Sequence, residues 1–419
     1  MKNLIKSEFT RNVLKHFSGS AISNLIGLIA LPFLARLYSP DEFGIFQLLL
    51  STILTFSVVS SLKLELAIVI PKEKIISDNL FKLALVTLFF TTALFSVTLY
   101  FFGEFVLSAI SAEKLTPYVL YISLGIFVSG FFQLVQYIPI REKEYAFLSK
   151  SKIIQASFTQ TSSLTAGLLG SNFLGLFLSM MAGVLLNVFI ILRKNTYLLK
   201  GFSKKRLLSV LRSYKKFPIV NSPMTFLNTI SNELPVFMFT FYFGPEVVGF
   251  YMVANRLIRR PISMLGQSLS QVYFQSASEA YHKSSKELMR LYKKTIKRMA
   301  IIVSLPLLVV LVLGPEIVEL VLGSTWKESG FYMQILSFWI FFQLINGTVG
   351  TTFLIIDKQE IGFYLIIISL ITRFLAMFLF RETVTGMLIA LSLSAGLFYF
   401  SYMFVMYYYL KKSIKKSLK

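Results

Sequence analysis

Charged side chains inside otherwise apolar stretches are the residues of this chain best suited to chemistry. Arg256, Arg259 and Arg260 lie together in one such stretch, and Glu233 and Arg373 lie in two others. A charge in a membrane span costs about 2.5–3.5 kcal/mol on insertion scales, so each of these residues marks a candidate functional site. Guanidinium groups bind phosphate well because their planar forks donate paired hydrogen bonds. We therefore predict an aqueous cavity adapted to a negatively charged substrate.

Glu233 has two alternative interpretations. At a rise of 1.5 Å per residue it lies at about the same depth as the three clustered arginines. It either neutralises one arginine as a structural ion pair or binds a coupling cation. Even if it pairs with one arginine, this single carboxylate leaves three of the four guanidinium groups without an acidic partner inside the spans, which is why an anionic substrate is expected.

Three further charged residues lie nearer the ends of their apolar stretches. Arg36 is expected at an outer end, where pairing with Asp41 or Glu42 competes with a role in the cavity. Lys63 and Glu65 are expected near an inner end, where long charged side chains reach out to the membrane interface. None of these residues is predicted to be catalytic.

The composition excludes most kinds of catalytic centre. The chain has no cysteine and two histidines, which removes a thiolate nucleophile, a Cys-ligated metal and a His-rich site. The sequence also lacks the GxxxxGK[ST], GxGxxG and HExxH motifs. The breaks between apolar stretches are too short for an external catalytic domain. We predict that the protein is not an enzyme and uses no metal or cofactor.

The elements that must position the charges are membrane helices. Of the 419 residues, 55% are hydrophobic and 15% charged, whereas soluble domains are about 25% charged. Spanning the hydrocarbon core takes roughly 20 mostly apolar residues, and about twelve such stretches occur. They cover residues 17–37, 44–64, 83–102, 118–140, 153–169, 172–192, 219–243, 249–274, 295–314, 331–356, 361–380 and 386–410.

The excess of basic residues predicts the orientation. The net charge of +22 comes largely from Lys and Arg in alternate breaks that share a side with the N-terminus, whereas Arg36, Lys114, Lys327 and Arg381 fall on the opposite side. By the positive-inside rule, both termini are cytoplasmic. This distribution accounts for the charge without a nucleic-acid partner, and it suits contact with anionic membrane lipids.

Three matches in the same order indicate an internal repeat. FFQL occurs at 131–134 and again at 341–344, GEFV at 103–106 resembles PEIV at 315–318, and Pro40 and Gly44 correspond to Pro245 and Gly249. Each match falls on the same ordinal span of a six-span half, so the halves are parallel repeats with a binding site expected between them. The expected organisation is a six-helix lobe at 1–192, a basic cytoplasmic linker at 193–218 and a second six-helix lobe at 219–419.

Four segments carry a family resemblance that covers nearly the whole chain. They are LARLYSPDEFGIF at 34–46, LELAIVIPK at 64–72, GFYMVANRLIRRPISMLGQSLSQVYFQ at 249–275 and GSTWKESGFYMQILSFWIFFQL at 323–344. These segments resemble the Wzx-type oligosaccharide flippases, which share a superfamily with lipid II flippases and multidrug and toxin extruders. Arg256 matches the Ala-x-Arg-Leu pattern of that family, whereas Arg259 and Arg260 are additional.

The resemblance implies a fold and a function. The implied fold is all-α, with two six-helix lobes in a V around a cationic cavity. The implied activity is alternating-access transport of undecaprenyl-diphosphate-linked oligosaccharide, across the bacterial inner membrane, for O-antigen or capsule assembly. Other polysaccharide assembly proteins are then expected partners. A cation-coupled multidrug exporter is the alternative, and a membrane-embedded glycan polymerase or ligase is the third.

Overall fold

Every regular element that the structure describes is a helix. The structure is a computed structural model that describes the backbone of residues 8–110, 112–199, 201, 203–356 and 358–417. The chain divides into two compact units, 1–249 and 250–419. The sequence-based lobes divide it at 193–218 instead, because they follow the repeat; those boundaries stay a prediction.

The first unit is built from helices that pack in pairs, some of them distant in the sequence. α1 (Glu8–Leu37) packs on α6 (Tyr145–Leu168), α6 on α7 (Phe173–Arg193), and α3 (Lys74–Ala109) on α4 (Val119–Val135). α2 (Pro40–Ser57) lies against α4 and α9 (Ser222–Phe243), and the short α5 (Tyr137–Arg141) and α8 (Lys204–Ser213) complete the unit. The 3-10 helix η1 (Leu64–Val69) and the π-helical turn η4 (Phe217–Asn221) lie in contact.

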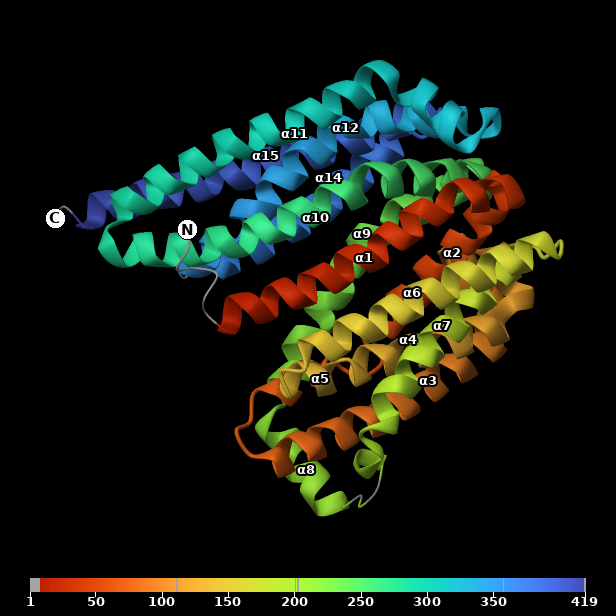
Figure 1. Cartoon of the computed structure of the whole chain (residues 1–419), viewed down its shortest axis with the longest axis horizontal. Coiled ribbons are helices and arrows are strands. Elements are labelled where there is room, and N and C mark those ends of the chain that lie inside the picture. The colour runs from red at the N-terminus through yellow and green to blue at the C-terminus, as the bar shows by residue number, and fades with distance from the viewer. Residues whose placement is uncertain (1–7, 111, 200, 202, 357, 418–419) are drawn as a thin grey trace. The chain divides into compact units, whose positions relative to one another are not determined.

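The second unit is dominated by long helices that run beside one another (Figure 1). α11 (Ser285–Leu322) packs on α12 (Lys327–Val349), and α15 (Val384–Ser417) packs on both α12 and α14 (Gln359–Leu379). α10 (Pro245–Lys283) begins in the first unit and continues into the second, and the single turn α13 (Thr352–Ile355) follows α12.

Local sequence signals explain several helix ends. Ser39 and Glu42 form a capping box at the start of α2, with Pro40 in the first turn, an arrangement that satisfies otherwise free amide groups. Gly244 and Gly323 adopt positive φ values of 86° and 103° and end α9 and α11. Glycine suits both positions because it lacks the Cβ that penalises this conformation.

The starts of α2 and α10 meet through a reciprocal contact. A Cβ added to Gly44 would lie 1.7 Å from the carbonyl oxygen of Pro245, and one added to Gly249 would lie 1.9 Å from that of Pro40. These are the four residues that the sequence repeat equates. Pro40 and Pro245 thus occupy equivalent positions where the two helix starts meet. Only glycine at positions 44 and 249 lets the two backbones come this close, because any other residue would add a Cβ.

Eight helices of the described part are long and apolar enough to cross a membrane. The remaining predicted stretches, 44–64, 153–169, 219–243 and 249–274, fall on α2, α6, α9 and α10, which are helical but more polar. The spans that satisfy both length and hydropathy are Gly19–Leu37, Lys74–Ser108, Glu113–Arg141, Phe173–Arg193, Ser285–Leu322, Ser324–Ile355, Glu360–Leu379 and Val384–Lys412.

One predicted span is not a continuous helix. The sequence predicts a single helix over 44–64, but α2 ends at Ser57 and the chain unwinds before η1 begins at Leu64. Leu62 and Lys63 have φ values of 51° and 58°, in the left-handed region. Hydropathy could not reveal the break, because it is held by side chains of neighbouring helices.

Candidate functional site

α10 places two of the predicted arginines on one helical face. Arg256 and Arg259 are three residues apart, a spacing that brings side chains together on a helix. Asn255 is four residues before Arg259 and shares that face. The side chain of Arg260 lies outside the described residues, so its predicted role stays a prediction.

Arg259 and Arg373 meet at a tryptophan of α12. The guanidinium carbon of Arg259 lies 5.6 Å from the centroid of the Trp339 ring, and that of Arg373 lies 5.4 Å from it. Both distances lie within the range of a cation–π interaction, which gains strength when the groups are desolvated. Arg373 and Trp339 are each 3% exposed. We name these three residues the Arg–Trp–Arg cluster.

Tyrosine and glutamine side chains surround Arg373. Arg373 donates a hydrogen bond to Tyr399 of α15, and Tyr251 of α10 also lies near its guanidinium group. Gln343 Nε2 donates to the Tyr399 hydroxyl at 3.1 Å. Four helices, α10, α12, α14 and α15, therefore contribute to the surroundings of one buried guanidinium.

α15 fixes the position of Trp339 by inserting a hydroxyl into α12. In a regular helix the amide of Trp339 would donate to the carbonyl of Ile335. Here the Trp339 amide donates to Ser392 Oγ at 3.3 Å, and Ser392 Oγ donates to the Ile335 carbonyl at 2.6 Å. The Ser392 hydroxyl thus bridges the Trp339 amide and the Ile335 carbonyl, and it ties α15 to α12 at the cluster.

Buried polar atoms next to the cluster have capacity for a ligand. Trp339 Nε1, Gln343 Oε1, Asn346 Oδ1 and Asn255 Oδ1 are buried and make no hydrogen bond within the described part of the chain. Residues 339, 343 and 346 recur along one face of α12. Such groups are costly to bury unless water or a ligand satisfies them. With two guanidinium groups beside them, the arrangement suits an anionic, hydroxyl-bearing ligand.

Two other predicted residues lie in the first unit. Arg36 is exposed near the end of α1. Glu233 on α9 accepts a hydrogen bond from Ser51 of α2 at 2.5 Å, and Gln47 Nε2 donates to the same serine at 3.1 Å. The Glu233 carboxylate thus joins α9 to α2. Its roles as an arginine partner or a cation ligand stay predictions.

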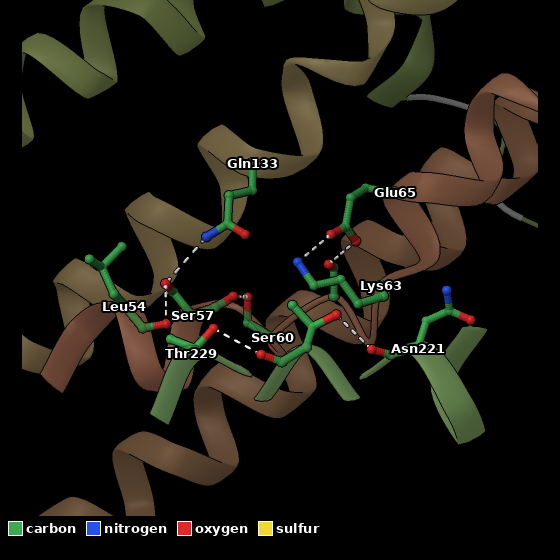
Figure 2. A network of polar contacts seen from close by, with 10 residues as sticks. Leu54, Ser57, Ser60, Lys63, Glu65, Gln133, Asn221 and Thr229 are labelled. Atoms are coloured by element: carbon green, nitrogen blue, oxygen red, sulfur yellow. Dashed lines mark hydrogen bonds and ion pairs between the residues drawn. The ribbon is translucent and has the colours of Figure 1, made fainter. Parts of the chain in front are cut away.

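Lys63 and Glu65 form a buried ion pair at the break between α2 and η1 (Figure 2). Lys63 Nζ lies 3.2 Å from Glu65 Oε1, and the two side chains are 10% and 2% exposed. Ser61 Oγ donates to the other carboxylate oxygen. The sequence predicts that both residues reach the membrane interface, whereas in the structure each has a partner inside the protein.

Hydrogen bonds from within the segment and from two neighbouring helices hold the unwound segment that carries this pair. Ser60 Oγ donates to the carbonyl of Ser57 at 2.7 Å, and Gln133 Nε2 of α4 donates to Ser57 Oγ at 3.3 Å, as Figure 2 shows. Thr91 Oγ1 of α3 donates to the Ser60 carbonyl. Irregular backbone at membrane depth is tolerated only when it is satisfied in this way.

An apolar hollow of about 500 Å³ lies between α11 and α12, lined by residues from Ser304 to Leu311 and from Gln334 to Phe342. Its polar side chains are already engaged, because Ser304, Ser337 and Gln334 donate to the carbonyls of Ala300, Met333 and Leu311. What remains is hydrocarbon surface, so the hollow suits an apolar chain.

Sequence reasoning missed the residues that organise the cluster. Trp339 is one of only two tryptophans in the chain and lies inside a predicted span, a signal that would have justified attention. Ser392 and Tyr399 gave no such signal. Their importance depends on which turn of α12 or α14 they face.

Comparisons with known proteins agree with this fold. A solved multidrug resistance MATE family transporter of the MOP superfamily, in an inward-facing conformation, superposes with a TM-score of 0.73 at 14% identity, covering 94% of this chain and 96% of that one. The lipid II flippase MurJ, in an inward closed conformation, gives 0.73 and 14%, covering 93% and 86%. A search of curated protein sequences gives no match.

These likenesses show that the chain has the all-α fold of those two proteins. The family model described as polysaccharide biosynthesis protein matches residues 33–330, which is more than half of the chain. The chain therefore belongs to the polysaccharide biosynthesis protein family.

Proposed function

We propose that the protein is a flippase for undecaprenyl-diphosphate-linked oligosaccharide repeat units. It moves them from the cytoplasmic to the outer face of the bacterial inner membrane for assembly of a surface polysaccharide such as O-antigen or capsule. The observation that carries the proposal is the Arg–Trp–Arg cluster, two guanidinium groups within 5.6 Å of one buried indole in a chain of the polysaccharide biosynthesis protein family.

The chemistry of the cluster fits the head of such a substrate. Arg259 and Arg373 offer forked donors to the diphosphate. The unsatisfied Gln343, Asn346 and Asn255 oxygens suit sugar hydroxyls. A few sugars carry about ten hydroxyls, and stripping each of its hydrogen bonds costs about 1–3 kcal/mol, so unassisted crossing is negligibly slow. Arg256, Arg260 and Arg36 are further proposed contacts for the same head group.

The proposed topology has twelve spans and two cytoplasmic termini. α2, α6, α9 and α10 complete the twelve; they are more polar than the other helices, as helices that line a hydrated path must be. The Lys and Arg distribution supports the orientation. The lobes at 1–192 and 219–419, joined by the basic linker, are proposed to alternate access.

The membrane potential is the proposed driving force. A diphosphate with about two negative charges gains about 2.3 kcal/mol per charge per 100 mV when it moves outward through an inside-negative field. Arginines that offset its desolvation allow this without a coupled cation. Transport should therefore stop in proteoliposomes whose potential is collapsed while ion gradients are kept. Unchanged transport would reject this mechanism.

A cation-coupled multidrug exporter is the second candidate, and one observation favours it. Glu233 is a carboxylate within the predicted spans, held by Ser51, and could bind a coupling ion. Cationic drugs would be repelled by Arg259 and Arg373, which argues against it. Efflux of a cationic dye from proteoliposomes that fail to move lipid-linked oligosaccharide would favour the exporter.

The decisive cellular test is deletion of the gene in the native host. Lipid-linked repeat units should accumulate at the cytoplasmic face while the surface polysaccharide disappears, because the units cannot cross. A normal surface glycan would count heavily against a flippase. If the protein were instead a polymerase or ligase, its deletion would leave lipid-linked units at the outer face, because those units would still cross.

The site itself is tested by substitution in proteoliposomes at equal protein amounts. Arg259→Gln and Arg373→Gln each remove a charged hydrogen bond worth about 1.5–3 kcal/mol, so transport should fall roughly 10- to 100-fold. Arg381→Gln is the matched control, since Arg381 is exposed beyond α14 and its guanidinium donates to the Phe378 carbonyl. Full transport by both cluster variants would remove the anion-site proposal.

A further inference from the structure

The buried Lys63–Glu65 pair takes no part in the proposed transport site, and its geometry is unusual for two residues so close in sequence. Residues two apart in a helix do not face each other. Here the left-handed backbone at Leu62 and Lys63, a costly conformation for residues other than glycine, turns the lysine so that its amine reaches Glu65. The break in the helix therefore brings a fixed cation onto a buried carboxylate.

A carboxylate that is 2% exposed needs a positive partner. In transporters, interrupted helices with unwound backbone are where coupling cations bind. The break between α2 and η1 has these parts: a carboxylate, the Ser61 hydroxyl and an unwound chain from Val58 to Lys63. Figure 2 shows the Lys63 amine lying against the Glu65 carboxylate, where a free ion would bind.

We propose that Lys63 is a tethered cation that occupies a monovalent-cation site built around Glu65. Its ammonium group balances the carboxylate, so this site takes up no Na⁺ in the natural protein. Removing the amine opens the site to a cation from solution. This inference concerns the first unit alone and does not depend on the identity of the transported molecule.

The other titratable groups on the elements around Glu65 are Tyr137, Arg141 and the charged residues of α3. Tyr137 on α5 lies near the carboxylate. Arg141, at the end of α5, donates to the carbonyls of Ile68 and Pro71 at 3.1 and 2.8 Å. On α3, Asp78 lies among Lys74, Lys82 and Arg141. η4 contributes Phe217–Asn221, which contains no titratable side chain. Lys63 is thus the cation that contacts Glu65 among the described residues.

Thermal unfolding of the purified full chain in detergent tests the proposal. Melting is compared in NaCl and in choline chloride at equal ionic strength, between pH 5 and pH 9. The natural protein should show no Na⁺-specific shift that depends on Glu65. Lys63→Met should melt several degrees lower in choline at high pH and recover when Na⁺ or acid is supplied. Lys63→Arg, which keeps the charge, should show no such recovery.

Two further variants keep the test decisive. Lys63→Met/Glu65→Gln removes both charges, so its melting should no longer respond to Na⁺ or acid. Glu65→Gln alone should melt with the same Na⁺ dependence as the natural protein, because neither binds a free cation at this site. The proposal is overturned if Lys63→Met melts identically in both salts at every pH, or gives no folded protein in either salt. It is also overturned if the natural protein is stabilised by Na⁺ and Glu65→Gln loses that effect.

Discussion

The reciprocal contact between α2 and α10 makes a sharp prediction for Gly44. A Cβ there would lie 1.7 Å from the Pro245 carbonyl oxygen, more than an ångström short of the 3.0 Å below which such contacts essentially never occur. The obstacle is backbone and no side chain can turn away, so the cost of Gly44→Ala lies near the upper end of the about 1–3 kcal/mol typical of overpacking. Alanine returns up to about 1 kcal/mol of helix propensity. The expected net loss is about 2 kcal/mol.

Thermal or urea unfolding in detergent measures this loss against a matched control. Gly347 lies inside α12 with no atom within 4 Å of its added Cβ, so Gly347→Ala should be stabilising by about 0.5–1 kcal/mol. The two alanine variants should therefore differ by about 3 kcal/mol. Equal stability of Gly44→Ala and Gly347→Ala would refute the close approach of the two helices.

The reciprocity of the contact is tested by a double variant. Gly249→Ala should resemble Gly44→Ala, because its Cβ would lie 1.9 Å from the Pro40 carbonyl oxygen. Once one alanine has separated the helices, the second meets less obstruction, so Gly44→Ala/Gly249→Ala should cost less than the sum of the single variants. Strict additivity would mean that the two glycines act at independent places.

Three further predictions concern stability. Burial, followed by the negative charge of Glu42, raises the pKa of Tyr38 to about 12. The Tyr38 hydroxyl donates a hydrogen bond to the Ser163 carbonyl at 2.9 Å. The contribution of Tyr38 to the stability of the fold should therefore be complete below about pH 10, the pKa of tyrosine in the unfolded chain. It should fade as the pH rises towards 12. Tyr38→Phe should cost about 0.5–1.5 kcal/mol at pH 7 and flatten this part of the pH–stability curve. Ser39→Ala, which removes the α2 cap, should cost about 1 kcal/mol in urea unfolding; no change would mean that the cap contributes nothing. Gly396→Ala, whose Cβ would lie 2.5 Å from the Phe338 ring, should lower the melting temperature; an unchanged melting temperature would contradict tight packing of that ring against Gly396.

Sequence patterns predicted the helical membrane fold well but could not predict its interruptions. Hydropathy alone located the eight helices of the described part that are long and apolar enough to cross a membrane, because apolar length is a property of the chain itself. The left-handed residues Leu62 and Lys63 lie in a stretch of unremarkable hydropathy. The residues just before them, Ser57 and Ser60, accept hydrogen bonds from Gln133 and Thr91 of other helices. The same dependence on distant partners explains why Lys63 was expected at an interface and not beside a buried carboxylate.

The candidate site divides in the same way. Arg259 and Arg373 could be selected because a charge within an apolar stretch is conspicuous in a sequence. Their shared contact with Trp339 could not be predicted, because it requires α10 and α14 to approach α12 at one turn. Ser392 enters only through its hydrogen bonds to α12.

The placement of Trp339 also gives the molecule a built-in spectroscopic reporter. The only other tryptophan is Trp326, which is 1% exposed beside Phe250 at the turn between α11 and α12. Replacing Trp326 by phenylalanine leaves a single indole, flanked by two guanidinium groups whose field shifts its emission. An anion that draws either cation away would change the fluorescence directly. Because the chain has no cysteine, a single cysteine can be introduced at a chosen position and labelled with a thiol-reactive quencher, with no background labelling.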